Sequence, residues 1–115
     1  MIKPFFFHMK VKPHPENTEY SHVSGAYVNI WVIDEDSEKA KARVHDYLSH
    51  FLWLIIEERY ELEPTQAQIA QLDEEEYSNY SRAVEQGISA HFDASQKNPN
   101  GNAFSVETLK PPKWN

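Results

Sequence analysis

Two stretches near the N-terminus alternate between apolar and polar side chains, and this alternation limits the possible folds more than any other feature of the sequence. In residues 5–12, the apolar phase consists of Phe5, Phe7, Met9 and Val11. In residues 20–34, it consists of Ala26, Val28, Ile30 and Val32. A period of two residues is typical of a strand with one buried face, and Pro13 and Pro15 separate the two runs because proline has no amide hydrogen to donate. We therefore expect an antiparallel hairpin with a wide loop, and Gly25 indicates a bulge or a close backbone approach in the second strand.

The next segment changes to the spacing of a helix. Asp36 or Ser37 can accept hydrogen bonds from free backbone amides, as residues at helix N-termini do. One helical stripe then consists of Ala40, Val44, Tyr47, Leu48 and Phe51. This spacing predicts an amphipathic helix that begins near residue 37.

Residues 53–61 fit two interpretations, because they could extend this helix or form a strand. We prefer the strand, since the run Leu-Trp-Leu-Ile-Ile is apolar on all sides, as in a central strand. In that strand, Trp53 and Ile55 are predicted to share a face with Trp31. The residues predicted to lie under the helices are Leu54 and Ile56.

Capping signals outline a second helical region over residues 65–86. It contains two capping boxes, Thr65 with Gln68 and Asp73 with Glu76. The second box predicts a break near Leu72. Gly87 is a typical helix stop, and residues 88–94 alternate again, which predicts a last strand.

The expected order is strand, strand, helix, strand, helix, strand. It predicts an α+β fold, a two-layer sandwich in which two helices cover one face of a mostly antiparallel sheet, ferredoxin-like in style. Residues 1–97 are expected to form a single domain. Residues 98–115 are expected to contain a turn, a short extra edge strand and a proline-rich tail.

Composition excludes several classes of protein. The 115 residues carry a formal net charge of −7, which argues against nucleic-acid partners and against docking on anionic membranes. The chain has no cysteine, so disulfides and thiolate chemistry are excluded. No apolar run approaches the ~20 residues that a membrane helix needs, and no secretory signal is visible, so we expect an acidic protein of the cytoplasm.

If both helices cover one face of the sheet, the other face collects aromatic and charged side chains. The candidate residues for a ligand or interface surface on that face are His8, Tyr27, Asn29, Trp31, Arg59, His91 and Asp93. Apolar patches of this kind commonly mark interfaces, so we expect a homodimer and allow for another protein partner. His91 is predicted to mark the site, with Asp93 orienting its ring.

Histidines offer the other candidate chemistry. The six histidines form no HxH or HExxH pattern, so we predict neither a metal nor a cofactor.

The preferred function is a small, soluble, self-associating binding, accessory or regulatory domain without catalysis of its own. The alternatives are a small enzyme or metal-binding protein that uses histidines and carboxylates of the open face, and an acidic inhibitor or immunity-type protein. The sequence identifies neither ligand nor pathway.

Overall fold

A computed structural model describes residues 1–96, so the predictions for residues 98–115 lie outside the described part of the chain. The secondary structure begins with two long strands, and three helices and two further strands follow within the described residues. In chain order the elements are β1 (Lys3–Pro13), β2 (Val23–Asp34), α1 (Ser37–His50), β3 (Trp53–Leu62), α2 (Gln66–Ile69), α3 (Glu74–Gln86) and β4 (Ile88–Gln96). The strand predicted over residues 53–61 is therefore confirmed, and α1 ends before it.

The described strands form one sheet with the order β3-β1-β2-β4, and each neighbouring pair is antiparallel. This confirms an α+β fold with an antiparallel sheet. The strand order differs from the ferredoxin-like order that we expected. The opening hairpin supplies the two central strands, and the later strands add one to each side.

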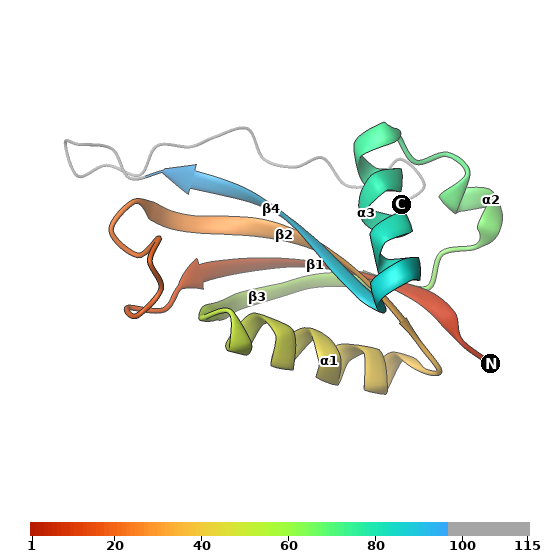
Figure 1. Cartoon of the computed structure of the whole chain (residues 1–115), viewed down its shortest axis with the longest axis horizontal. Coiled ribbons are helices and arrows are strands. Elements are labelled where there is room, and N and C mark those ends of the chain that lie inside the picture. The colour runs from red at the N-terminus through yellow and green to blue at the C-terminus, as the bar shows by residue number, and fades with distance from the viewer. Residues whose placement is uncertain (97–115) are drawn as a thin grey trace.

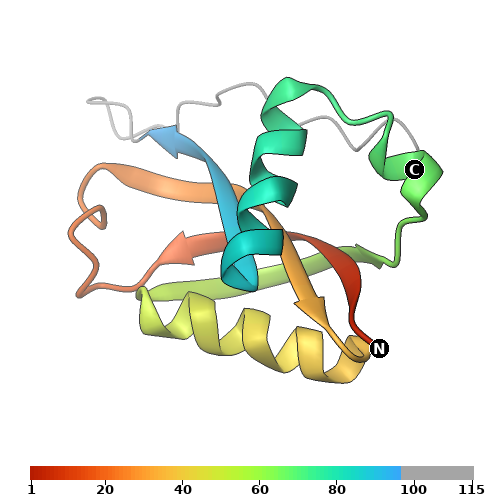
Figure 2. The same cartoon turned by 45° about the vertical axis from the view of Figure 1, so that its right-hand side comes forward.

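The helices lie on both faces of the sheet rather than on one (Figure 1). One face packs under α1, whose buried residues are Ala40, Val44 and Leu48. The opposite face packs against α2 and α3 through Ile69 and Ala83, and Figure 2 shows α3 crossing the sheet on the side away from α1. No helix within residues 1–96 has the length and apolar character needed to cross a membrane.

The apolar character of both phases of β1 and β2 explains this arrangement. Phe5 and Phe7 belong to the core under α1, whereas Phe6 belongs to the core under α2 and α3. Trp31 lies opposite Phe6 on β2 and is likewise buried. Because both faces carry large aromatic rings at this end of the sheet, helices on one face alone would leave the other rings in water.

The phase predicted for β3 is wrong. Trp53 and Ile55 pack against the core under α1, on the face opposite to Trp31. Leu54 and Ile56 are 39% and 50% exposed instead of lying under helices. The physical reason is the pairing of β3 with β1, which places Trp53 opposite Pro13 and Ile55 opposite Val11, in the phase of β1 that faces α1. Residues directly opposite each other on paired strands share a face. The pairing shifts register twice, between His8 and Met9 and between Lys10 and Val11, and the two inserted residues together leave the phase of Trp53 and Ile55 unchanged.

The helix boundaries follow from local capping, as predicted. Asp36 accepts a hydrogen bond from the Lys39 amide at 2.8 Å, and both predicted capping boxes are present, with Thr65 and Asp73 as N-caps. Gly87 ends α3 in the left-handed region, with φ 94°, a conformation that glycine adopts without strain.

Candidate functional site

The strand register brings most of the predicted site residues together on one face of the sheet. His8 lies opposite Asn29, and Asn29 lies opposite His91, so the three form one row across β1, β2 and β4. In the next row, Tyr27 lies opposite Asp93. The two histidines of the row are not direct neighbours, because the β2 strand with Asn29 lies between them.

Trp31 belongs to the core rather than to this surface. It is 1% exposed, and its ring lies 5.0 Å from the ring of Phe6 and 5.1 Å from the ring of Tyr80 on α3. The patch on which a homodimer was predicted is therefore filled by side chains of the same chain, including Ile69 and Ala83.

His8 is the most deeply buried member of the row, with 4% of its surface exposed. Its ring stacks between Tyr27 and Tyr60, at centroid distances of 5.6 and 5.0 Å. The Nδ1 atom lies 2.6 Å from Oδ1 of Asn29. Because an amide oxygen only accepts hydrogen bonds, Nδ1 carries the proton, and the neutral ring keeps its lone pair at Nε2.

Burial lowers the pKa of His8 below its ordinary value, because desolvation disfavours the charged ring. The hydrogen bond that His8 donates to Asn29 raises this pKa and opposes the shift, the nearby Arg59 charge lowers it further, and the Glu57 charge raises it. A ring that is 4% exposed offers a ligand in solution almost no surface to contact. The geometry therefore suits a neutral, structural histidine.

This lowered pKa predicts a pH dependence of stability. In the unfolded chain His8 takes up a proton near pH 6.5, whereas in the folded protein it does so only at lower pH. The stabilisation is fully present above pH 6.5 and is lost as the pH falls through the folded pKa. We expect the free energy of unfolding, measured by urea denaturation, to fall between pH 7.5 and 5.5, and less steeply in His8→Gln. An equal slope in the variant would contradict the assignment.

A buried polar network fastens α3 to the sheet beside His8. Asn79 donates from Nδ2 to the backbone oxygen of Asn29 at 3.0 Å, and it accepts from the Ser89 hydroxyl at 2.6 Å. Arg82 donates from Nε to the Ser89 oxygen at 3.2 Å. Sequence reasoning missed Asn79. The available signal was its position four residues before Ala83, on the buried face of the helix.

His91 lies at the edge of this network, and its ring faces a carboxylate other than the predicted one. Its Nε2 atom lies 3.1 Å from Oε1 of Glu75, on the first turn of α3. We had expected Asp93 to orient this ring. Glu75 was missed because it comes from a helix that the sequence placed on the other face.

Charged and aromatic side chains gather around Tyr27, beyond the part of the face that α3 covers. The Arg59 guanidinium carbon lies 5.1 Å from the centre of the Tyr27 ring, and Nζ of Lys10 lies 5.9 Å from it. Both distances allow a cation–π interaction. Arg59 also lies 3.7 Å from a Glu57 oxygen and keeps 40% of its side chain exposed. We call Lys10, Tyr27 and Arg59 the cation–aromatic cluster.

Within residues 1–96, no three or more histidine and carboxylate side chains converge as a metal ion would require. Comparisons with protein-family models, with curated proteins and with solved structures find no match to this chain.

Proposed function

We propose that this chain is a binding protein without catalysis of its own, and that its ligand carries a negative charge and binds at the cation–aromatic cluster. The observation that carries this proposal is the gathering of two cationic side chains over the Tyr27 ring. The whole chain has a net charge of −7. Glu57 lies opposite Lys10 on β3 and Asp93 lies opposite Tyr27 on β4, so an anionic ligand competes with these two carboxylates for Lys10 and Arg59.

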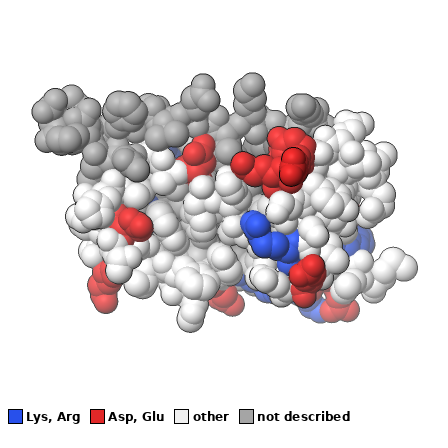
Figure 3. All heavy atoms as spheres, turned by 45° about the horizontal axis from the view of Figure 1, so that its top comes forward, with Lys and Arg blue, Asp and Glu red and all other residues white. Residues whose placement is uncertain are grey.

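The charges around the cluster support this choice. Within the described residues, Lys10 has no ion pair, and Arg59 has one long pair with Glu57. A guanidinium that stacks on a ring keeps its N–H edge directed outward, where a carboxylate or phosphate can accept two hydrogen bonds. In contrast, Figure 3 shows acidic side chains gathered over α3, whose first turn carries Glu74, Glu75 and Glu76. An anion is therefore favoured at the cluster and disfavoured beside α3.

The same geometry supports binding in preference to catalysis. His8 is buried, and its ring stacks with those of Tyr27 and Tyr60. Acid–base catalysis requires a titrating group within hydrogen-bond reach of the substrate. Solvent reaches the cations and the ring of the cluster, and it also reaches the pair of His91 and Glu75, whose side chains are 36% and 71% exposed.

Titration with benzoate, followed by backbone amide NMR shifts, tests this function. We expect shifts at Lys10, Tyr27 and Arg59, and much smaller shifts with the uncharged analogue benzamide. Arg59→Gln is expected to weaken benzoate binding about tenfold, the loss typical of one charged hydrogen bond. The matched control is Lys39→Gln, which removes a cation of α1 that pairs with Glu35 at 2.8 Å.

Two outcomes would reject the proposal. In the first, benzoate and benzamide give equal shifts, which would show that charge does not matter. In the second, Lys39→Gln weakens binding as much as Arg59→Gln, which would show a general charge effect rather than a site.

A further inference from the structure

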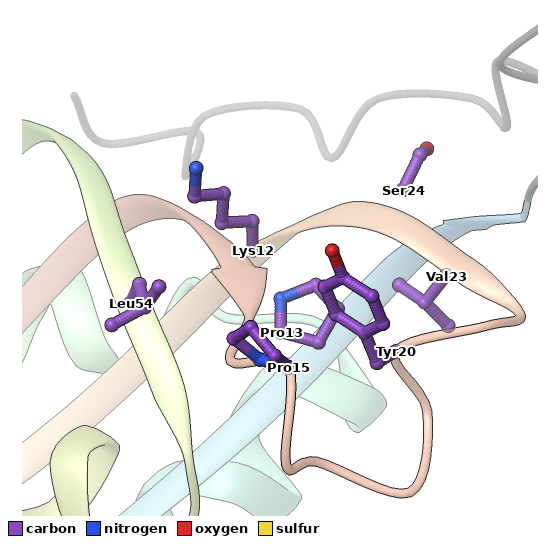
Figure 4. Close-up of a pocket in the computed structure, with 7 residues that line it drawn as sticks. All are labelled: Lys12, Pro13, Pro15, Tyr20, Val23, Ser24 and Leu54. Atoms are coloured by element: carbon purple, nitrogen blue, oxygen red, sulfur yellow. The ribbon is translucent and has the colours of Figure 1, made fainter.

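A hollow of about 300 Å³ opens on the molecule where β1 ends and β2 begins. The residues that line it are Lys12, Pro13, Pro15, Tyr20, Val23, Ser24 and Leu54 (Figure 4). This volume lies at the lower limit of pockets that hold small molecules. Lys12 lies two residues after Lys10 on β1 and therefore on the same face, so the hollow adjoins the cation–aromatic cluster.

The walls of the hollow are held in place by hydrogen bonds. Asn17, in the loop that follows β1, donates from Nδ2 to the backbone oxygen of Leu52 at 2.9 Å. The His14 amide donates to the same oxygen at 2.9 Å. On the other wall, β2 shifts register against β4 between Val23 and Gly25, and the hydroxyl of the extra residue, Ser24, donates to the Ser95 oxygen at 3.1 Å. The shape is therefore preformed, which lowers the entropic cost of binding.

The lining separates into an apolar part and a polar rim. The apolar part comes from Pro13, Pro15, Val23 and Leu54. In Figure 4 the ammonium end of Lys12 and the hydroxyl ends of Tyr20 and Ser24 extend toward the same side, away from the prolines. A molecule with one charged end and one apolar end matches this separation.

The charged side chains at the rim determine whether the charged end of the ligand is an anion or a cation. Within the described residues, neither Lys10 nor Lys12 takes part in an ion pair, whereas the other lysines do, namely Lys3, Lys39 and Lys41. Lys10 and Lys12 are two positions apart on β1, which is about 7 Å along the strand. The ammonium group of Lys12 is thus available to a carboxylate at the rim, whereas Lys10 does not line the hollow and lies opposite Glu57.

We propose that the hollow binds the apolar chain of an amphiphilic carboxylate, of the size of a medium-chain fatty acid, whose carboxylate lies at Lys12. The inference rests on the proposed function, because it names the ligand class for the same half of the sheet face. The carboxylate interacts with the Lys12 ammonium group, which takes part in no ion pair within residues 1–96, and the chain leaves water against the prolines and Leu54.

Calorimetric titration with acetate, butanoate, hexanoate and octanoate tests the inference. A fully buried methylene strengthens binding about fourfold, and in this open hollow we expect about two- to fourfold for each added methylene. Lys12→Gln is expected to weaken the binding of every carboxylate about tenfold, while the dependence of affinity on chain length remains. Leu54→Ser is expected to reduce the dependence on chain length.

The matched control is Ile56→Ser, which changes an exposed apolar residue of the same strand that does not line the hollow. Equal affinity for all four acids, or an equal effect of Ile56→Ser and Leu54→Ser, would overturn the inference. Benzoate separates the two proposals. If benzoate binds at the cation–aromatic cluster and chain length has no effect, only the hollow is rejected. If benzoate also fails, the proposed function is rejected.

Discussion

Trp31→Ala is expected to lower the free energy of unfolding by about 3–5 kcal/mol, the range typical for removing a large aromatic side chain from a core. Trp31 is 1% exposed and contacts the rings of Phe6 and Tyr80. Its loss leaves a cavity between the sheet and α3 that neighbouring side chains cannot fill. Chemical denaturation followed by circular dichroism measures the change.

The control for this substitution is Tyr77→Ala, because Tyr77 lies on the outer side of α3 and is 49% exposed. We expect a much smaller loss there, since little apolar surface is buried. Light scattering on folded Trp31→Ala distinguishes the core role from the interface role predicted by the sequence. A variant that keeps its stability but dissociates from a dimer would show that Trp31 lies between two chains.

Asn79→Ala is expected to loosen α3 and to cost about 1–3 kcal/mol, because two buried groups of the sheet each lose a hydrogen bond. The group that loses its donor is the backbone oxygen of Asn29, and the Ser89 hydroxyl loses its acceptor. Hydrogen exchange measures where the loss falls. We expect the amides of α3 to exchange faster while those of α1 keep their protection, since α1 packs on the opposite face.

Glu85→Ala serves as the control, because Glu85 is exposed on the same helix. We expect Glu85→Ala to leave hydrogen exchange in α3 unchanged. It is expected to change the free energy of unfolding by no more than about 0.5 kcal/mol. If Asn79→Ala instead increased exchange in α1 and α3 equally, the network would stabilise the whole fold and not the attachment of one helix.

Sequence reasoning predicted the elements well wherever the signal is local. The alternation in β1 and β2 and the N-caps Asp36, Thr65 and Asp73 each act over a few residues. The side of the sheet that each helix covers is not set by such local signals. Both phases of the central strands are apolar, so alternation alone does not say which phase meets which helix, and the sequence-based choice of one covered face was wrong.

The same distinction applies to the candidate site. His8, Tyr27 and Asn29 could be placed on one face because β1 and β2 alternate without interruption. Tyr60 and Asn79 could not, since their positions depend on which residue of β3 pairs with His8 and on the packing of α3. Contacts between distant segments depend on register and packing, and a single sequence carries only weak signals for either.

The two register shifts in β3 also bear on how the protein behaves at high concentration. β3 is an outer strand of the described sheet and carries the exposed side chains Leu54 and Ile56. A straight apolar edge of this length would act as a template for another chain and promote aggregation. The bulges bend the edge, and Glu57, Glu58 and Glu61 place like charges along it, so two copies that met edge to edge would repel each other. The irregular pairing of β3 and its row of carboxylates therefore protect an exposed strand from pairing with its own copies.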